Sequence, residues 1–168
     1  PAIASDASSE IPSLFATTGT VGVVDLGASQ TVIGSEQVPE LLSQLPDWVR
    51  AKTRRCPCSL TFRFGNHQTL CSRHALVLPL GSKSFRIAVV EGKTPFLISN
   101  AFLKGLKAVI DTDKETLYSR LLSRYFSLQK SSKNLFLMDI NQLWEDEKAE
   151  AMNMTQDEFF QEHHLPLE

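Results

Sequence analysis

The residues around one carboxylate, that of Asp25, could support either acid–base catalysis or phosphate binding. Asp25 follows an apolar run and precedes a glycine, in the stretch VVDLGASQT at residues 23–31. Two interpretations of such a loop are open. In one, Asp25 shares a proton with a second carboxylate and the pair activates a water for hydrolysis, because two carboxylates so close together cannot both ionise. In the other, Gly27 lets the backbone approach a phosphate group and Asp25 holds a metal-bound water.

The first interpretation has a consequence for assembly. The chain has 168 residues and contains a single Asp-x-Gly loop. The second carboxylate must then come from an identical chain across a two-fold axis. We therefore expect Asp25 to be catalytic only in a homodimer.

Three stretches resemble the retropepsin family, and specifically the protease segment of retrotransposon polyproteins. VVDLGASQTVIG is similar to the family's apolar strand, Asp loop and second strand. FRFGNHQTL resembles the flap, a hairpin that closes over substrate. PFLISNAFLKGLKAVIDTDKETLY resembles the family's later strand, short helix and final hairpin. The resemblance covers roughly residues 18–118, and the order and spacing of the three stretches are more specific than any one of them.

The resemblance implies an all-β fold, a closed acid-protease barrel, and a homodimeric aspartic endopeptidase that cuts peptides or a polyprotein without a cofactor or metal. The catalytic residue would be Asp25. The active-site loop would also contain Leu26, Gly27, Ala28 and Ser29, and Ser29 would support the Asp25 carboxylate. The flap would include Phe64, Gly65, Asn66 and His67. The walls of the substrate subsites would come from Val32, Pro95, Phe96 and Leu97.

At two positions the chain departs from the family's pattern. Leu26 stands where the family has Thr or Ser, whose hydroxyl helps bind the two loops of the dimer together. Leucine cannot form that hydrogen bond, so packing must hold the loops, and each buried group left unpaired costs about 1–3 kcal/mol. Ser99 replaces a glycine near the loop. These departures keep an alternative open, namely a catalytically weak or inactive retropepsin-like module for dimerisation or interaction.

The phosphate-binding interpretation rests on the local resemblance of GVVDLGASQT to the phosphate loop of sugar kinases and actin-like ATPases. Those proteins need two lobes, a second phosphate loop and a much longer chain. This chain has only eight glycines, and they do not cluster into a glycine-rich partner loop. We therefore favour the hydrolytic interpretation.

The elements that must position Asp25 are short strands separated by turns, which predicts a mainly β domain over residues 14–119. Alternating apolar residues in SLTFRF indicate one arm of a hairpin over residues 58–80. Short helices are expected over residues 35–45 and 100–106, the second with Asn100 as its N-cap. Residues 1–13 are predicted to be a flexible lead-in. Residues 120–168 have apolar clusters without a clean period and are predicted to be a linker and an acidic, partly helical or disordered tail.

Composition argues against several other classes of protein. A net charge of -2 gives no overall basic field, so nucleic-acid binding is not expected. Three cysteines, an odd number, suit an intracellular, cytoplasmic setting, such as a retroelement particle, better than a disulfide framework. Cys56 and Cys58 are too close together for the usual zinc-finger spacing, so no metal site is expected. No apolar run reaches the length of a membrane span, so no membrane partner is expected.

Overall fold

The computed structural model describes residues 19–63, 68–145 and 166–167. The strands are β1 (Val21–Asp25), β2 (Val32–Gly34), β3 (Arg54–Arg63), β4 (Thr69–Leu80), β5 (Lys83–Val90), β6 (Leu97–Ser99), β7 (Ala108–Asp111), β8 (Thr116–Ser119), β9 (Arg124–Ser127), β10 (Gln129–Lys130), β11 (Phe136–Asp139) and β12 (Pro166–Leu167). The α-helices are α2 (Val38–Gln44), α3 (Asp47–Lys52) and α4 (Asn100–Gly105), and the 3-10 helices are η1 (Ser35–Gln37) and η2 (Ile140–Trp144). The fold is therefore mainly β, as the sequence predicted.

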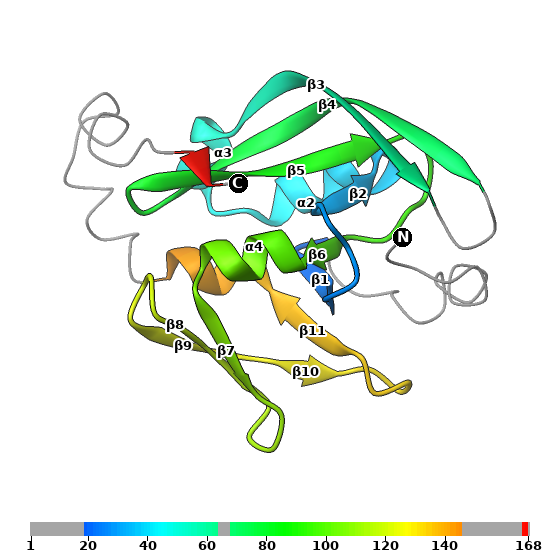
Figure 1. Cartoon of the computed structure of the whole chain (residues 1–168). Coiled ribbons are helices and arrows are strands. Elements are labelled where there is room, and N and C mark those ends of the chain that lie inside the picture. The colour runs from blue at the N-terminus through cyan, green and yellow to red at the C-terminus, as the bar shows by residue number, and fades with distance from the viewer. Residues whose placement is uncertain (1–18, 64–67, 146–165, 168) are drawn as a thin grey trace.

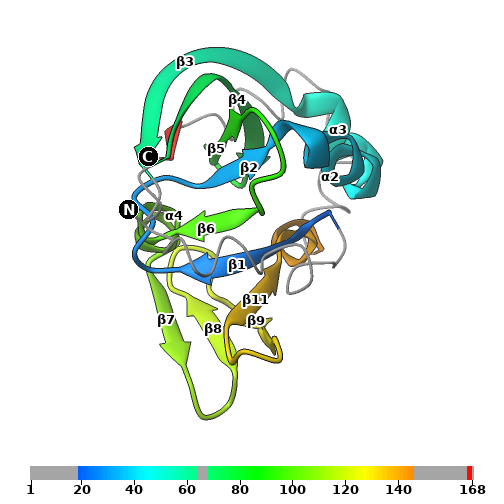
Figure 2. The ribbon, with the colours of Figure 1, turned by 90° about the vertical axis from the view of Figure 1, so that its right-hand side faces the viewer.

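The strands form two sheets. The larger has nine strands in the order β10-β11-β1-β6-β2-β5-β4-β3, with β12 pairing with β5. The smaller has the order β7-β8-β9. Figure 1 shows the long strands β3, β4 and β5 in the upper half and the smaller sheet in the lower half, with β1, β6 and α4 between them. Figure 2 shows the same order from the side, with β3 and β4 arching over β2 and β6.

Among the described residues, no sheet closes into the predicted barrel. A barrel closes only when its end strands pair with each other. In the part of the chain that the structure describes, the end strands β10 and β3 pair only with β11 and β4 respectively. Residues 108–127 form the separate smaller sheet instead of continuing the larger one.

Two hydrophobic clusters pack against the larger sheet. In β5, Ile87 and Val89 belong to the larger cluster, while Ala88 and Val90 belong to the smaller one. Alternate residues of a strand point to opposite faces, so this apolar run is buried on both sides. The smaller cluster consists of Val23, Val32, Ala88, Val90, Leu97 and Leu137, and Leu60, Phe62 and Leu70 of the β3–β4 hairpin pack against it.

From residue 120 to residue 145, the expected linker is part of the fold, whereas the predicted lead-in over residues 1–13 and most of the predicted acidic tail lie outside the described residues. β9 pairs with β8 across that boundary, and β11 pairs antiparallel with β1. Met138 and Trp144 are buried in the larger cluster. Trp144 also donates its Nε1–H to the carbonyl of Pro79 at 2.7 Å. Strands of two to four residues are too short to show a period, which is why the sequence of this region does not reveal them.

The two predicted helices are present at the predicted positions, but their bounds and caps differ from the prediction. The helix predicted over residues 35–45 is observed as η1 followed by α2, and α3 was not predicted. The N-cap of α4 is Ser99, whose side chain accepts the N–H of Phe102, and not Asn100. Within the described residues, no helix is both long and apolar enough to cross a lipid bilayer.

Candidate active site

Asp25 is the last residue of β1, at the edge of a tight loop. β1 pairs in parallel with β6, and Asp25 stands opposite Ser99 in that register. The backbone N–H of Gly27 donates to Oδ1 of Asp25 at 3.0 Å, and the N–H of Ala28 donates to the backbone carbonyl of Asp25 at 3.1 Å. The carboxylate is therefore held by its own loop, and the strand below it fixes where the loop begins.

Burial raises the pKa of the Asp25 carboxyl above its ordinary value of 3.8, while backbone hydrogen bonds from Gly27 and Ala28 partly oppose the rise. The cause is desolvation: partial burial removes water from the carboxyl, and this loss destabilises the charged carboxylate more than the neutral acid. Asp25 thus retains its proton to a higher pH than a free aspartic acid. That behaviour suits a group that must give and take a proton.

The rest of the loop divides into exposed and buried residues. Leu26 is 61% exposed, which is unusual for a large apolar side chain. Gly27 and Ser29 are also exposed, whereas Ala28 is buried. Among the described residues, the hydrogen bond to the Asp25 carboxylate comes from Gly27 and not from Ser29. The supporting role predicted for Ser29 is therefore not seen in the single chain.

Two buried hydroxyls that the sequence analysis did not assign lie at the base of the loop. Thr31 Oγ1 donates to Ser99 Oγ at 3.0 Å, and the backbone N–H of Ser99 donates to Thr31 Oγ1 at 3.1 Å. Ser99 Oγ also accepts the N–H of Phe102 at 3.0 Å. Next to them, the N–H of Asn100 donates to the carbonyl of Ala28 at 3.0 Å. The sequence does mark Ser99, because it replaces a glycine of the family's pattern. It does not reveal that Thr31 is the hydrogen-bond partner of Ser99.

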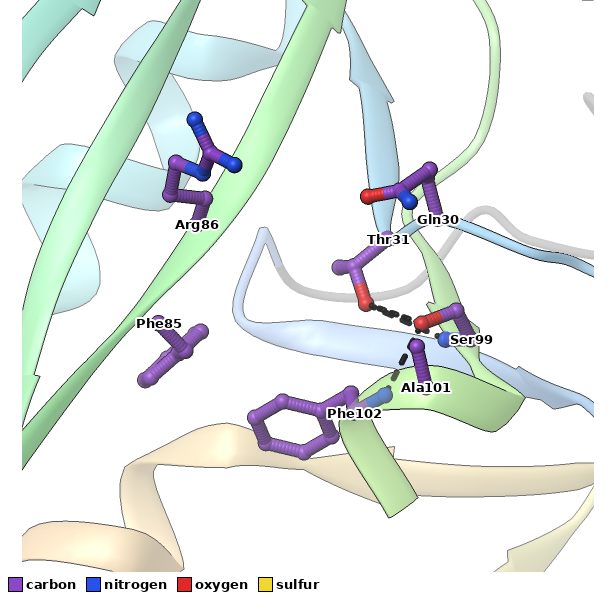
Figure 3. A pocket seen from close by; sticks show the side chains of 7 residues that line it. All are labelled: Gln30, Thr31, Phe85, Arg86, Ser99, Ala101 and Phe102. Carbon is purple, nitrogen blue, oxygen red and sulfur yellow. Dashed lines mark hydrogen bonds between the residues drawn. The ribbon is translucent and has the colours of Figure 1, made fainter. Parts of the chain in front are cut away.

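A small pocket lies beside these hydroxyls, between the loop, β5 and α4 (Figure 3). Its lining consists of Gln30, Thr31, Phe85, Arg86, Ser99, Ala101 and Phe102. The volume of about 20 Å³ is enough for one water molecule and far below the size of a site for an organic ligand. Asp25 is not among its lining residues, so this pocket is not the substrate cleft.

The four residues predicted as subsite walls are all buried in the single chain: Val32, Pro95, Phe96 and Leu97. Val32 and Leu97 belong to the smaller cluster, and Phe96 belongs to the larger one. A substrate side chain does not reach such positions unless the core is displaced. Their burial argues that they support the site from behind and do not contact substrate.

The predicted hairpin is present, but the predicted flap tip, Phe64, Gly65, Asn66 and His67, lies outside the described residues. The two arms remain paired up to the register Arg63 with Thr69. Next to that pair, Phe62 stands opposite Leu70, and both side chains pack on the smaller cluster. The arms therefore belong to the same sheet as β1, the strand that ends at Asp25, and pack on the cluster to which Val23 of β1 belongs.

The three cysteines are free thiols, and Cys58 Sγ lies 3.1 Å from the hydroxyl of Ser72. Where side chains are described, no group of three His, Cys, Asp or Glu residues converges in a way that could hold a metal ion. The structure thus brings Asp25, its loop, Thr31 and Ser99 together, and it leaves the cysteines apart from them.

A scan of the sequence against models of protein families found no match, and a search of curated proteins found none either. The interpretation of Asp25 therefore rests on the residues around it and on their geometry.

Proposed function

We propose that the chain is a retropepsin-like aspartic endopeptidase from a retroelement polyprotein, active as a homodimer with one Asp25 per subunit. The observation that carries the proposal is the Asp25 carboxyl itself, which is half-buried, has a raised pKa and is held at a strand end by the N–H of Gly27. A carboxyl of this kind can act as an acid or as a base over a mildly acidic to neutral range.

The order of elements around Asp25 supports the same proposal. β1 and its loop lead into β2, the β3–β4 hairpin follows, and β6 with α4 returns to pair beside Asp25. This is the order in which the resemblance to retropepsins places the Asp loop, the flap and the later strand with its helix. Of the fold that this proposal implies, the structure directly supports the mainly β class.

The proposed mechanism uses the two Asp25 carboxyls of the dimer, one ionised and one protonated. The ionised carboxylate takes a proton from water while the water oxygen bonds to the carbonyl carbon of the peptide. The protonated carboxyl gives its proton to the carbonyl oxygen. The C–N bond of the resulting gem-diol then breaks: the first carboxyl gives its proton to the leaving amine nitrogen, and the second, now ionised, takes a proton from one hydroxyl of the gem-diol, which becomes the product acid. The original protonation states are thereby restored. The substrate is an extended peptide with apolar residues beside the cut bond.

Leu26 supports the dimer on physical grounds. A leucine that is 61% exposed next to Asp25 gains stability when a second copy covers it, by about 1–2 kcal/mol if burial becomes complete. A two-fold axis that brings the two Asp25 carboxyls together also brings the two Leu26 side chains close. Apolar packing would then replace the hydroxyl grip that the family normally uses.

Substitution of Asp25 by Asn tests the proposal. Asparagine keeps an oxygen for the Gly27 N–H but cannot exchange the proton, so we expect cleavage of a peptide substrate to fall at least about 100-fold. Cleavage is measured by mass spectrometry of the products, and folding by circular dichroism.

Asp111→Asn is the matched control for this substitution. Asp111 also ends a strand and also accepts a backbone N–H two residues on, from Asp113 at 3.0 Å, but it lies in the smaller sheet. We expect Asp111→Asn to leave cleavage unchanged. Full activity in the Asp25→Asn chain would refute the proposed mechanism.

A second candidate is a non-catalytic retropepsin-like module that dimerises or recruits partners. Leu26 is the observation that favours it, since no hydroxyl is available there to tie the catalytic loops together. Incubation of the unsubstituted chain with a peptide library at several pH values, with and without pepstatin, separates the two functions. Cleavage that pepstatin inhibits supports the enzyme, and a stable dimer without cleavage supports the module.

A further inference from the structure

We propose that Thr31 and Ser99 act together as positioning residues for Asp25, an inference that rests on the proposed function and concerns how this chain holds its catalytic loop. Both side chains are buried, Thr31 being 6% and Ser99 1% exposed. They are bound to each other twice, from hydroxyl to hydroxyl at 3.0 Å and from the Ser99 N–H to the Thr31 hydroxyl at 3.1 Å. Figure 3 shows these two bonds and the third bond, from the Phe102 N–H to the Ser99 hydroxyl.

The position of Ser99 allows the pair to hold both ends of the loop. The loop leaves β1 at Asp25, which stands opposite Ser99 in the parallel register, and it ends at Thr31, whose side chain is bonded to Ser99. A single residue of β6 therefore meets both ends of the loop. Between them, the carbonyl of Ala28 accepts the N–H of Asn100 at 3.0 Å, which ties the middle of the loop to the first turn of α4.

The hydroxyl of Ser99 is what completes this arrangement. It caps α4 by accepting the Phe102 N–H, and it accepts the proton of Thr31. A glycine at position 99 would do neither. The adjoining pocket has a volume of about 20 Å³, so the hydroxyls do not serve a ligand larger than a water. Because Leu26 offers no hydroxyl for a grip between subunits, these bonds within one chain keep the Asp25 loop in place.

Thr31→Val tests the inference, because valine has nearly the same shape and lacks the hydroxyl. We expect kcat to fall about tenfold with little change in KM, since the loop then samples orientations in which the carboxylate is misplaced. We also expect the acidic limb of the pH profile of kcat/KM to move to lower pH, because a looser loop admits water to Asp25. Thr31→Ser keeps a hydroxyl and should restore most of kcat.

Ser119→Ala is the matched control. Ser119 is as buried as Ser99 and also makes two hydrogen bonds, one to the carbonyl of Leu106 at 2.8 Å and one from the N–H of Leu122 at 3.0 Å. It lies in the smaller sheet, and the partners of these two bonds, Leu106 and Leu122, are outside the loop. We expect this variant to lose stability without any change in kcat or in the pH profile.

Amide hydrogen exchange supplies a measurement that does not depend on activity. In Thr31→Val the Asn100 amide should exchange faster, because its acceptor Ala28 belongs to the loosened loop, while Ser119→Ala should leave it unchanged. Equal exchange in the two variants overturns the inference, as does faster exchange with an unchanged kcat. If the unsubstituted chain has no peptidase activity, the proposed function fails, and the Asn100 amide alone decides whether the pair holds the loop.

Discussion

Three described aspartates end a strand and accept the backbone N–H two residues later, each at 3.0 Å: Asp25, Asp111 and Asp139. The turn is therefore a common local device and does not by itself indicate catalysis. Asp25 differs from the other two in its surroundings. An exposed leucine follows it, and a parallel strand fixes its register. At the scale of the residue, environment and not type makes Asp25 the candidate.

The raised pKa of Asp25 predicts a pH dependence of stability. The folded chain holds this proton more tightly than the unfolded chain, whose carboxyl has the ordinary pKa of 3.8, so the ionised form of Asp25 costs stability. The cost is absent well below pH 3.8, grows towards the folded-state pKa, and is fully present above it. Asp25→Asn removes the cost, so this variant should be more stable than the unsubstituted chain at neutral pH.

Urea denaturation across a pH series, at one protein concentration, measures this difference. The stability advantage of Asp25→Asn should shrink as the pH falls towards 3.8. A difference that stays constant over the whole series, or a less stable variant at neutral pH, would show that burial does not raise the pKa of Asp25.

At the scale of elements, residues 120–145 complete the fold around the Asp25 loop. β1 has β6 on one side and β11 on the other, so the strand that ends at Asp25 is internal to the sheet. η2 follows β11 and places Trp144 against Phe85 of β5, with ring centroids 6.2 Å apart. The residues that follow the smaller sheet therefore pack against both β1, the strand that ends at Asp25, and the back of the core.

Trp144→Ala tests this role of the C-terminal elements. Trp144 is 1% exposed and loses both its packing and its hydrogen bond to Pro79, so we expect the free energy of unfolding to fall by about 3–5 kcal/mol. Tyr125→Ala is the control, because Tyr125 is 73% exposed, and its change should be below about 1 kcal/mol. Equal losses of unfolding free energy in the two variants, measured by urea denaturation, would mean that η2 does not stabilise the fold.

At the scale of the whole molecule, the proposed site needs two copies of the chain. It has a single Asp-x-Gly loop, and the large apolar side chain beside that loop is exposed. The proposed dimer resolves both features, because a two-fold axis supplies the second carboxyl and covers Leu26. Activity should then depend on protein concentration, and it should vanish where the chain is monomeric.

Leu26→Asp tests the dimer. A carboxylate beside its own symmetry mate repels it and removes the apolar contact, so we expect the dissociation constant of the dimer to rise at least about tenfold. Cleavage should fall in parallel. The measurement is sedimentation velocity over a range of concentrations.

Val109→Asp is the control for that substitution, because Val109 is also a large exposed apolar residue, at 53%, and lies in the smaller sheet. It should leave both the dissociation constant and the cleavage rate unchanged. A dimer that tolerates Leu26→Asp as well as Val109→Asp would place the interface elsewhere and remove the proposed partner of Asp25.

The sequence by itself determined the mainly β class, the hairpin around residues 58–80, the helix at residue 100 and the loop that begins at Asp25. These features depend on short-range signals, namely alternation, turn residues and an apolar run before a glycine, which act within a few residues. The place of Asp25 at a strand end could therefore be predicted.

The tertiary structure decided everything that depends on distant pairs. Thr31 and Ser99 are 68 residues apart, and no local pattern joins them. β11 pairs with β1 from the other end of the chain, which made residues 136–139 part of the sheet and not of a linker. The burial of Val32 and Leu97, and the exposure of Leu26, likewise follow from which faces the other strands cover. Local preferences choose the elements, whereas packing between elements chooses their neighbours.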